Sequence, residues 1–342
     1  MKKVLLTLIQ LAVTIGVLYW VFHDAEKRTQ MLEALARADY RWIAAAILAY
    51  VVVEVAAAIR WRMLLQVQGV HLGIFRLAGL FLIGMFYNQF LPGGTGGDII
   101  KIYLLLKETP GKKTGALLAV LFDRLIGLIG LISITGTLIA LRYDWLTTIP
   151  ETKRLVWGLL AVLGSAVLAL VTSFVITGFK LLDKLPAHFP MRAKLIELSA
   201  TYHLYAHHWP TTFAAYILSL ITHLGTFVTF LFVAYAFRAE VPAVNFFAVM
   251  PIERTISSLP ISFAGVGLRE KVLQVMLHGL CNVPEAVAVL IGSMSFLVMV
   301  FACLPGGIVY IFYKPSGVSR HVKLREMREE VATLEHEITE AE

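Results

Sequence analysis

Several uninterrupted apolar stretches of about twenty residues constrain what this chain can fold into more than any other feature. Mean hydropathy is +0.76, and 58% of the 342 residues are hydrophobic while only 15% are charged, which is not the composition of a soluble globular protein. A helix needs roughly 20 apolar residues to cross a hydrocarbon core about 30 Å thick. A transmembrane barrel would instead need alternating segments of about ten residues, which the sequence lacks. The sequence therefore predicts an all-α polytopic membrane protein, a helical bundle.

Six segments are long enough to be full crossings of the membrane. They cover residues 4–22, 42–66, 114–142, 154–178, 209–238 and 284–313. The charged stretch 24–40 is expected to form a short helix at the membrane interface, and residues 180–208 are expected to form a polar connection. We divide the chain into a transmembrane domain, residues 1–314, and a charged cytoplasmic tail helix, residues 315–342.

Two further apolar segments are interrupted by proline and glycine. The helix-breaking residues are Pro92, Gly93, Gly94, Gly96 and Gly97 in the first segment, and Pro260, Gly265 and Gly267 in the second. Proline removes a backbone donor and glycine permits left-handed turns, so a helix is expected to stop at both. Freed backbone groups are tolerated in hydrocarbon only when they are buried in protein or line a wet cavity. Because the breaks lie about half a chain apart, we predict two re-entrant helix pairs related as inverted repeats; chance similarity of two surface loops is the alternative.

Charged side chains lie inside or beside the apolar segments, where a charge near the bilayer centre costs at least about 2.5–3.5 kcal/mol. The candidate substrate-binding residues are Asn88, Asp98, Lys101, Asp123, Arg124, Glu253, Arg254, Arg269 and Glu270. Each broken segment ends in an acid and a base that open a helix, Asp98 with Lys101 in the first and Glu270 with Arg269 in the second. For Asp123 and Arg124 the alternative is an ion pair that only holds helices together, and for Glu54 the structural and functional roles both stay open.

The cationic residues among these candidates indicate an anionic ligand. Backbone N–H groups and the dipole at a helix N-terminus bind anions, and arginine adds forked donors that match phosphate oxygens. We expect Arg269, Arg124 and Lys101 to contact the phosphate of a phospholipid or a polyprenyl-phosphate lipid. Asp98 and Glu270 are expected to cap the broken helices or to tune the charge of the site.

Other classes of site are not expected. GGTGGD lacks the G-x-x-x-x-G-K-[ST] pattern of a nucleotide-binding loop, and no acid or cysteine completes a metal site with His203 and His207. No cofactor is therefore predicted. The net charge of +7 suits loops near anionic lipid rather than nucleic acid. Most lysines and arginines fall on one side of the predicted topology, which predicts that both termini lie in the cytoplasm. The expected location is the cytoplasmic (inner) membrane of a bacterial or archaeal cell.

Three motifs resemble the lysylphosphatidylglycerol synthetase transmembrane family, also called the flippase-like domain family. They are N-x-x-L-P-G-G-x-G-G-D at Asn88–Asp98, the Asp-Arg step at Asp123, and L-P-I-S-x-x-G-x-G-L-R-E at Leu259–Glu270. The resemblance covers nearly the whole chain apart from the tail. It implies a stand-alone membrane part, without the aminoacyl-transferase domain of two-domain members, that translocates a lipid or isoprenoid lipid. Asp98 and Lys101 depart from the Glu and Arg usual in the family.

The main hypothesis is therefore a lipid translocase that is not an enzyme. Two alternatives stay open: a membrane enzyme that acts on a lipid phosphate with Glu253 or Glu270 as base, and a non-catalytic membrane partner of a glycosyltransferase or synthetase. The expected partners are membrane lipids with a phosphate headgroup, and such an enzyme in the second alternative. A homo-oligomer is left open.

Overall fold

The computed structural model is helical throughout, and its described residues contain no strand. These residues are 15–16, 19, 24–90, 96–109, 111–178, 192–259 and 262–313. Five helices are long and apolar enough to cross a membrane: α3 (Tyr40–Val67), α6 (Lys113–Leu146), α7 (Pro150–Gly178), α9 (Trp209–Ala236) and α13 (Glu285–Phe312). The prediction of an all-α polytopic membrane protein is confirmed. The sixth predicted crossing, 4–22, falls almost wholly outside the described residues, and the predicted tail helix, 315–342, does so entirely.

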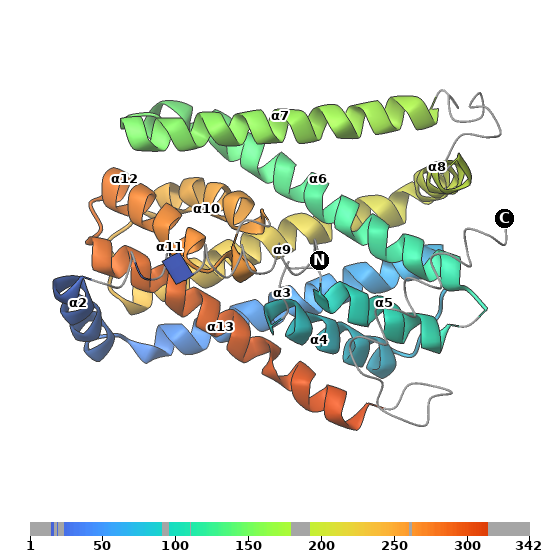
Figure 1. Cartoon of the computed structure of the whole chain (residues 1–342), viewed down its shortest axis with the longest axis horizontal. Coiled ribbons are helices and arrows are strands. Elements are labelled where there is room, and N and C mark those ends of the chain that lie inside the picture. Colours follow the sequence, from blue (N-terminus) through green and yellow to red (C-terminus); the bar gives the residue numbers. More distant parts are fainter. Residues whose placement is uncertain are drawn as a thin grey trace.

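Helices α3 and α9 pack along one another at the centre of the bundle, with α6 and α13 against both (Figure 1). Small residues let the two central helices approach closely, as is common in membrane bundles: a Cβ atom on Gly225 of α9 would lie 2.6 Å from Val53 of α3. The start of α3 lies beside the end of α9, because the Asp39 amide donates to the Ala236 carbonyl at 2.9 Å. The two helices are therefore antiparallel.

The first hairpin consists of α4 (Ile74–Phe90) and α5 (Gly96–Glu108). Arg76 near the start of α4 donates to Glu108 at the end of α5, with Nε and Oε2 3.0 Å apart. The hairpin therefore begins and ends at the same end of the bundle. The loop before it lies at this end too, since Lys112, just before α6, contacts the Gly69 carbonyl.

The second hairpin runs from α10 (Ala243–Ser258) through η2 (Phe263–Gly265) and α11 (Leu268–Leu273) to the π-helical η3 (Gln274–His278) and α12 (Gly279–Cys281). Arg142 near the end of α6 donates to Asn245 near the start of α10 at 2.6 Å, and Gly279 returns beside Ile149. This hairpin therefore enters from the end of the bundle opposite to the first, as Figure 1 shows.

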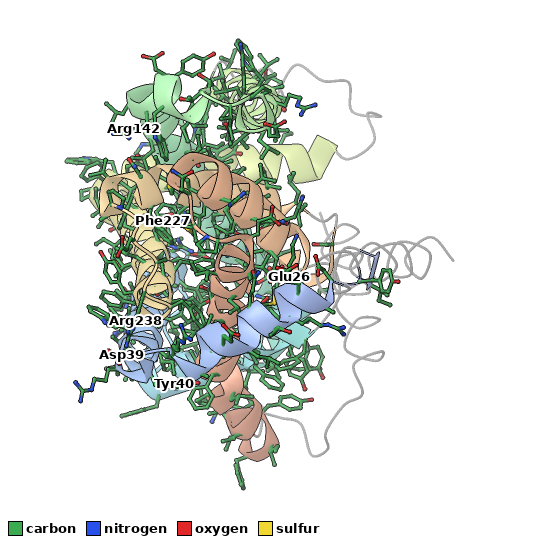
Figure 2. All side chains as sticks on the ribbon, turned by 90° about the vertical axis from the view of Figure 1, so that its left-hand side faces the viewer. Glu26, Asp39, Tyr40, Arg142, Phe227 and Arg238 are labelled. Atoms are coloured by element: carbon green, nitrogen blue, oxygen red, sulfur yellow. The ribbon has the colours of Figure 1, made fainter. Side chains whose placement is uncertain are left out.

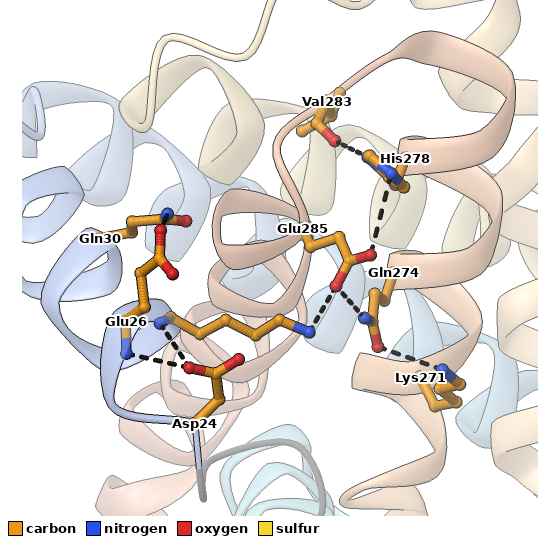
Figure 3. Close-up of polar contacts among 9 residues, drawn as sticks. Asp24, Glu26, Gln30, Lys271, Gln274, His278, Val283 and Glu285 are labelled. Atoms are coloured by element: carbon orange, nitrogen blue, oxygen red, sulfur yellow. Dashed lines mark hydrogen bonds and ion pairs between the residues drawn. The ribbon is translucent and has the colours of Figure 1, made fainter.

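The end from which the second hairpin enters is seen face-on in Figure 2, where α2 (Ala25–Ala36) lies across it. The Asp24 carboxylate caps α2 by accepting from the Glu26 amide at 2.9 Å. Glu285, the first residue of α13, joins α2 to the second hairpin (Figure 3): its Oε2 lies 2.5 Å from Lys27 Nζ and accepts from Gln274 Nε2 at 2.6 Å.

Two expectations about local structure need correction. Gly96 and Gly97 do not interrupt a helix but begin α5. Gly97 is not among the described glycines with positive φ; it is needed because α4 passes so close that a Cβ atom would strike the Gly84 carbonyl. Part of the predicted polar connection is helical, since α8 spans Arg192–His207.

The remaining predicted helix breakers divide into two groups. Gly265 and Gly267 do have positive φ, +75° and +85°, the conformation that glycine adopts without steric cost. Pro92, Gly93, Gly94 and Pro260 lie outside the described residues.

Candidate functional site

A cavity of about 380 Å³ lies inside the bundle between α3, α4, α5, α6, α9 and α10. The tips of both hairpins reach it: Asn88 and Asp98 from the first, and Arg254 and Ser258 from the second. The charged residues that line it are Glu54, Asp98, Asp123, Arg60, Lys101, Arg124 and Arg254. With three acids and four bases, the formal charge of the lining is +1 when His223 is neutral.

Two ion pairs cross between helices at this cavity. Arg60 of α3 donates to both oxygens of Asp123 on α6, Nε to Oδ1 at 2.8 Å and Nη2 to Oδ2 at 3.3 Å. Arg124, the next residue on α6, pairs with Asp98 of α5. The carboxylate of Asp98 therefore points across to α6 and not to Lys101 of its own helix.

Lys101 is buried, with 5% of its surface exposed, and its ammonium lies against aromatic rings. Its Nζ is 3.8 Å from the centre of the Trp61 ring and 5.2 Å from that of Phe81. Such cation–π contacts contribute about 2 kcal/mol when they are desolvated. Within the described part of the chain Lys101 forms no ion pair, and Arg254 forms neither an ion pair nor a hydrogen bond. Two cations of the cavity thus keep their charge available to an anion.

Two polar side chains of the cavity lining are held in place by hydrogen bonds to backbone groups of neighbouring helices. Asn88 Oδ1 accepts from the Gly97 amide at 3.0 Å, so this side chain joins the two helices of the first hairpin across the break. On the opposite wall, His223 Nε2 lies 3.1 Å from the Gly127 carbonyl. Asn88 therefore has a structural partner in addition to its predicted role in binding.

The other predicted residues, Glu253, Arg269 and Glu270, do not line this cavity. Arg269 is buried with its Nε 3.6 Å from Glu253 Oε1, and its Nη2 donates to the Ala264 carbonyl at 3.2 Å. Glu270 instead accepts from the Gly267 amide at 2.6 Å and so caps the start of α11. Glu270 thus occupies a capping position, one of the two roles expected of it, and Arg269 bonds elsewhere.

Glu253 and Arg254 are neighbours on α10 but contribute to different sites. Successive residues of a helix are about 100° apart around its axis, which directs Glu253 to Arg269 and Arg254 to the cavity. Sequence reasoning did not single out Arg60 or His223 as site residues. Arg60 could have been found from its spacing, because Val53, Ala57 and Arg60 follow the i, i+4, i+7 pattern on the face of α3 that lines the cavity.

Comparison with known proteins gives the same picture as the motifs. A family model for the lysylphosphatidylglycerol synthase TM region matches residues 7–307. The chain belongs to this family. A UPF0104 membrane protein of Pyrococcus horikoshii is 27% identical over 176 residues, which are 51% of this chain and 50% of that protein. The chain thus matches about half the length of this curated relative.

Membership of the lysylphosphatidylglycerol synthase TM region family confirms the resemblance that the three motifs carry. It is consistent with a multi-pass membrane protein that has a lipid-related function, and it is compatible with a non-catalytic transmembrane part. All three motifs contribute residues to the clusters described above: Asn88 and Asp98, then Asp123 and Arg124, line the cavity, and Glu270 caps α11.

Proposed function

We propose that this protein is a translocase that moves a lipid with a phosphate headgroup between the leaflets of the cytoplasmic membrane. One observation carries the proposal: two hairpins that enter from opposite ends of the bundle meet at a polar cavity holding Lys101 and Arg254. Broken helices at matching positions that meet near the middle of the bundle are the arrangement in which many secondary transporters bind their substrates.

The helix packing supports an inverted-repeat origin for this arrangement. The long helix α13 packs on α4 of the first hairpin, and the long helix α6 packs on α10 of the second. Likewise α5 packs on α6, and α11 packs on α13. Asp98 and Glu270 are each the third residue of the helix that follows a break. If α4, α5 and α6 are matched with α10, α11 and α13, each helix therefore contacts the counterpart of its partner's neighbour in the other half.

The charges of the cavity suit a phosphodiester. Its formal charge of +1 falls to zero when one monoanionic phosphate enters, and an uncompensated charge is costly at membrane depth. Lys101 and Arg254 are available without breaking an ion pair. Arg124 can also donate to the phosphate while it keeps its contact with Asp98, because a planar guanidinium has several donors and binds phosphate oxygens in pairs.

The buried cluster at the second hairpin supports an alternating mechanism. Glu253 and Arg269 are buried as an ion pair with Oε1 and Nε 3.6 Å apart, and the described part of this cluster also contains the buried side chains of Ser262 and Ser295. Taking two charges out of water costs several kcal/mol per ion unless their geometry is excellent, and 3.6 Å is longer than a normal hydrogen bond. In the proposed mechanism this cluster opens when the lipid is exposed to the other leaflet, and Arg269 then contacts the phosphate as predicted.

Transport by purified protein tests the proposal. The protein is reconstituted into phosphatidylcholine vesicles that contain a trace of fluorescent phosphatidylglycerol. A membrane-impermeant reductant bleaches only the probe in the outer leaflet, so the bleached fraction reports translocation. Arg254→Gln removes the unpaired guanidinium and leaves both cavity ion pairs intact. A hydrogen bond to a charged group contributes about 1.5–3 kcal/mol, so we expect a rate about 10- to 100-fold lower.

The matched control is Arg154→Gln, because Arg154 is an exposed arginine near the start of α7. Equal rates for wild type and Arg254→Gln would refute the role of the cavity. Mass spectrometry of the recovered lipids separates the alternatives: a chemically altered lipid would indicate an enzyme. Neither transport nor conversion by the purified protein would instead favour a membrane partner of another enzyme.

A further inference from the structure

A second cavity, of about 330 Å³, opens on the side of the bundle between α6 and α8. Leucine side chains of α6 form most of one wall, and Tyr202 of α8 contributes to the other. Arg124 and Leu128 line this groove and also line the polar cavity. The apolar groove and the charged cavity therefore adjoin, and Arg124 lies where they meet.

The groove is long enough for a lipid chain within one leaflet. It follows α6 from Leu118 to Leu128, and ten residues of helix rise about 15 Å. That is about half of a hydrocarbon core roughly 30 Å thick. Leu121 and Leu128 are 49% and 43% exposed, so the described protein does not fill the space between them.

The wall of the groove is held in place by its own packing. The Phe122 ring stacks face to face on Tyr205 of α8, with ring centres 3.7 Å apart and planes at 4°. The Tyr205 hydroxyl donates to the Leu64 carbonyl of α3 at 2.9 Å. These contacts fix α8 against α6 and α3, so the groove is present without a ligand.

Arg124 gives the groove a charge preference. Its side chain is 55% exposed although it pairs with Asp98, so its guanidinium has room for a second partner. On α6 it lies three residues after Leu121 and four before Leu128, which places all three on one face of the helix. An arginine on a leucine-lined face matches an anionic group attached to hydrocarbon.

We infer that this groove holds an acyl or isoprenoid chain of the transported lipid while the lipid's phosphate contacts Arg124. The passage between α6 and α8 is then the lateral entrance to the cavity. This inference rests on the proposed function and adds the route and the chemical class: the ligand is a chain-bearing anion. A soluble phosphate would fill only the polar cavity and leave the groove unused.

Photo-crosslinking distinguishes this occupant from the lipids that coat any membrane helix. Wild-type protein in phosphatidylcholine vesicles receives a trace of phosphatidylglycerol or of phosphatidylcholine, each with the same diazirine-bearing chain. Mass spectrometry then compares labelling of residues 118–128 with labelling of α7 around Leu168, which is 68% exposed. We expect about tenfold more labelling of 118–128 by phosphatidylglycerol than by phosphatidylcholine, and equal labelling of α7.

Two variants assign the preference to Arg124. In Arg124→Gln, the ratio of labelling by phosphatidylglycerol to labelling by phosphatidylcholine at residues 118–128 should fall to the ratio measured at α7. In Arg154→Gln, the ratio at residues 118–128 should stay as in the wild-type protein. Unchanged labelling of α7 in both variants shows that the bundle is intact. Equal ratios at the two places in the wild-type protein would overturn the inference, since the groove would then hold only bulk lipid.

Soluble glycerol phosphate separates a lipid from a free headgroup. We expect it to compete only at concentrations far above those of the lipid, because it lacks the chain; complete competition at equal concentration would overturn the role of the groove. If the protein shows the labelling preference but does not transport lipid, the proposed translocase function is wrong and the groove assignment stands. If it transports lipid without the labelling preference, the groove assignment is wrong and the translocase function stands.

Discussion

Replacing Gly97 with alanine tests whether the first broken segment is built for close packing. A Cβ atom at this position would collide with the Gly84 carbonyl oxygen and would lie 2.5 Å from the Asn88 amide nitrogen and 2.8 Å from Asn88 Cγ. The two closest atoms belong to the backbone of α4. Rotation of a side chain therefore does not relieve the collision, and α4 and α5 must separate.

The size of the effect follows from three contributions. Forcing extra volume into a packed interior costs about 1–3 kcal/mol. Separation of the helices also weakens the 3.0 Å hydrogen bond from the Gly97 amide to Asn88, which contributes about 0.5–1.5 kcal/mol. Alanine has a higher helix propensity than glycine, which offsets at most about 1 kcal/mol of this loss of stability. We expect Gly97→Ala to lower the free energy of unfolding by about 1–4 kcal/mol.

The assay is reversible unfolding in mixed micelles, with the mole fraction of denaturing detergent raised and tryptophan fluorescence recorded. Gly136→Ala is the matched control, because Gly136 lies inside α6 and a Cβ atom there would meet nothing within 4 Å. The control should be neutral or more stable by up to about 1 kcal/mol. If Gly97→Ala proves as stable as Gly136→Ala, the close-packing explanation for the glycine is refuted.

Three further predictions concern charged residues. Asp123→Asn leaves Arg60 unpaired inside the bundle and should cost about 3–5 kcal/mol, whereas the double change Arg60→Met with Asp123→Leu should lie near wild type in the same unfolding assay. Lys27→Ala breaks a partly exposed pair with Glu285, so it should cost less than about 1 kcal/mol while making α2 more sensitive to limited proteolysis. Lys112→Cys in a cysteine-free background should react with impermeant reagents only from the cytoplasmic side; labelling from outside would overturn the predicted topology.

Much of the fold could be predicted because long apolar helices leave a strong signal in the sequence. Residues 209–238 were predicted as a crossing, and α9 spans Trp209–Ala236. The helix α8 was missed because its sequence is polar and its position depends on a distant contact, the stacking of Tyr205 on Phe122. No local pattern contains that information.

The candidate site was predicted in part. Sequence reasoning selected the charged residues of the breaks but did not identify the partners of their side chains. The ion pairs instead join residues 26 and 63 positions apart, Asp98 with Arg124 and Arg60 with Asp123. Which face of each helix meets which neighbour depends on how the whole bundle packs, so these partners could not be predicted from spacing within one segment.

In the proposed mechanism, α10 couples the two clusters. It directs Glu253 to the buried Arg269 and Arg254 to the open cavity, and Pro251 inside the helix removes one of its backbone hydrogen bonds just before them. A rotation of α10 that released Arg269 from Glu253 would also carry Arg254 away from the cavity. The next residue, Thr255, is buried and donates to the Pro251 carbonyl at 2.7 Å, which ties the segment into one unit. In this mechanism the opening of the cluster at the second hairpin and the loss of a cation from the first site occur together, as alternating access requires.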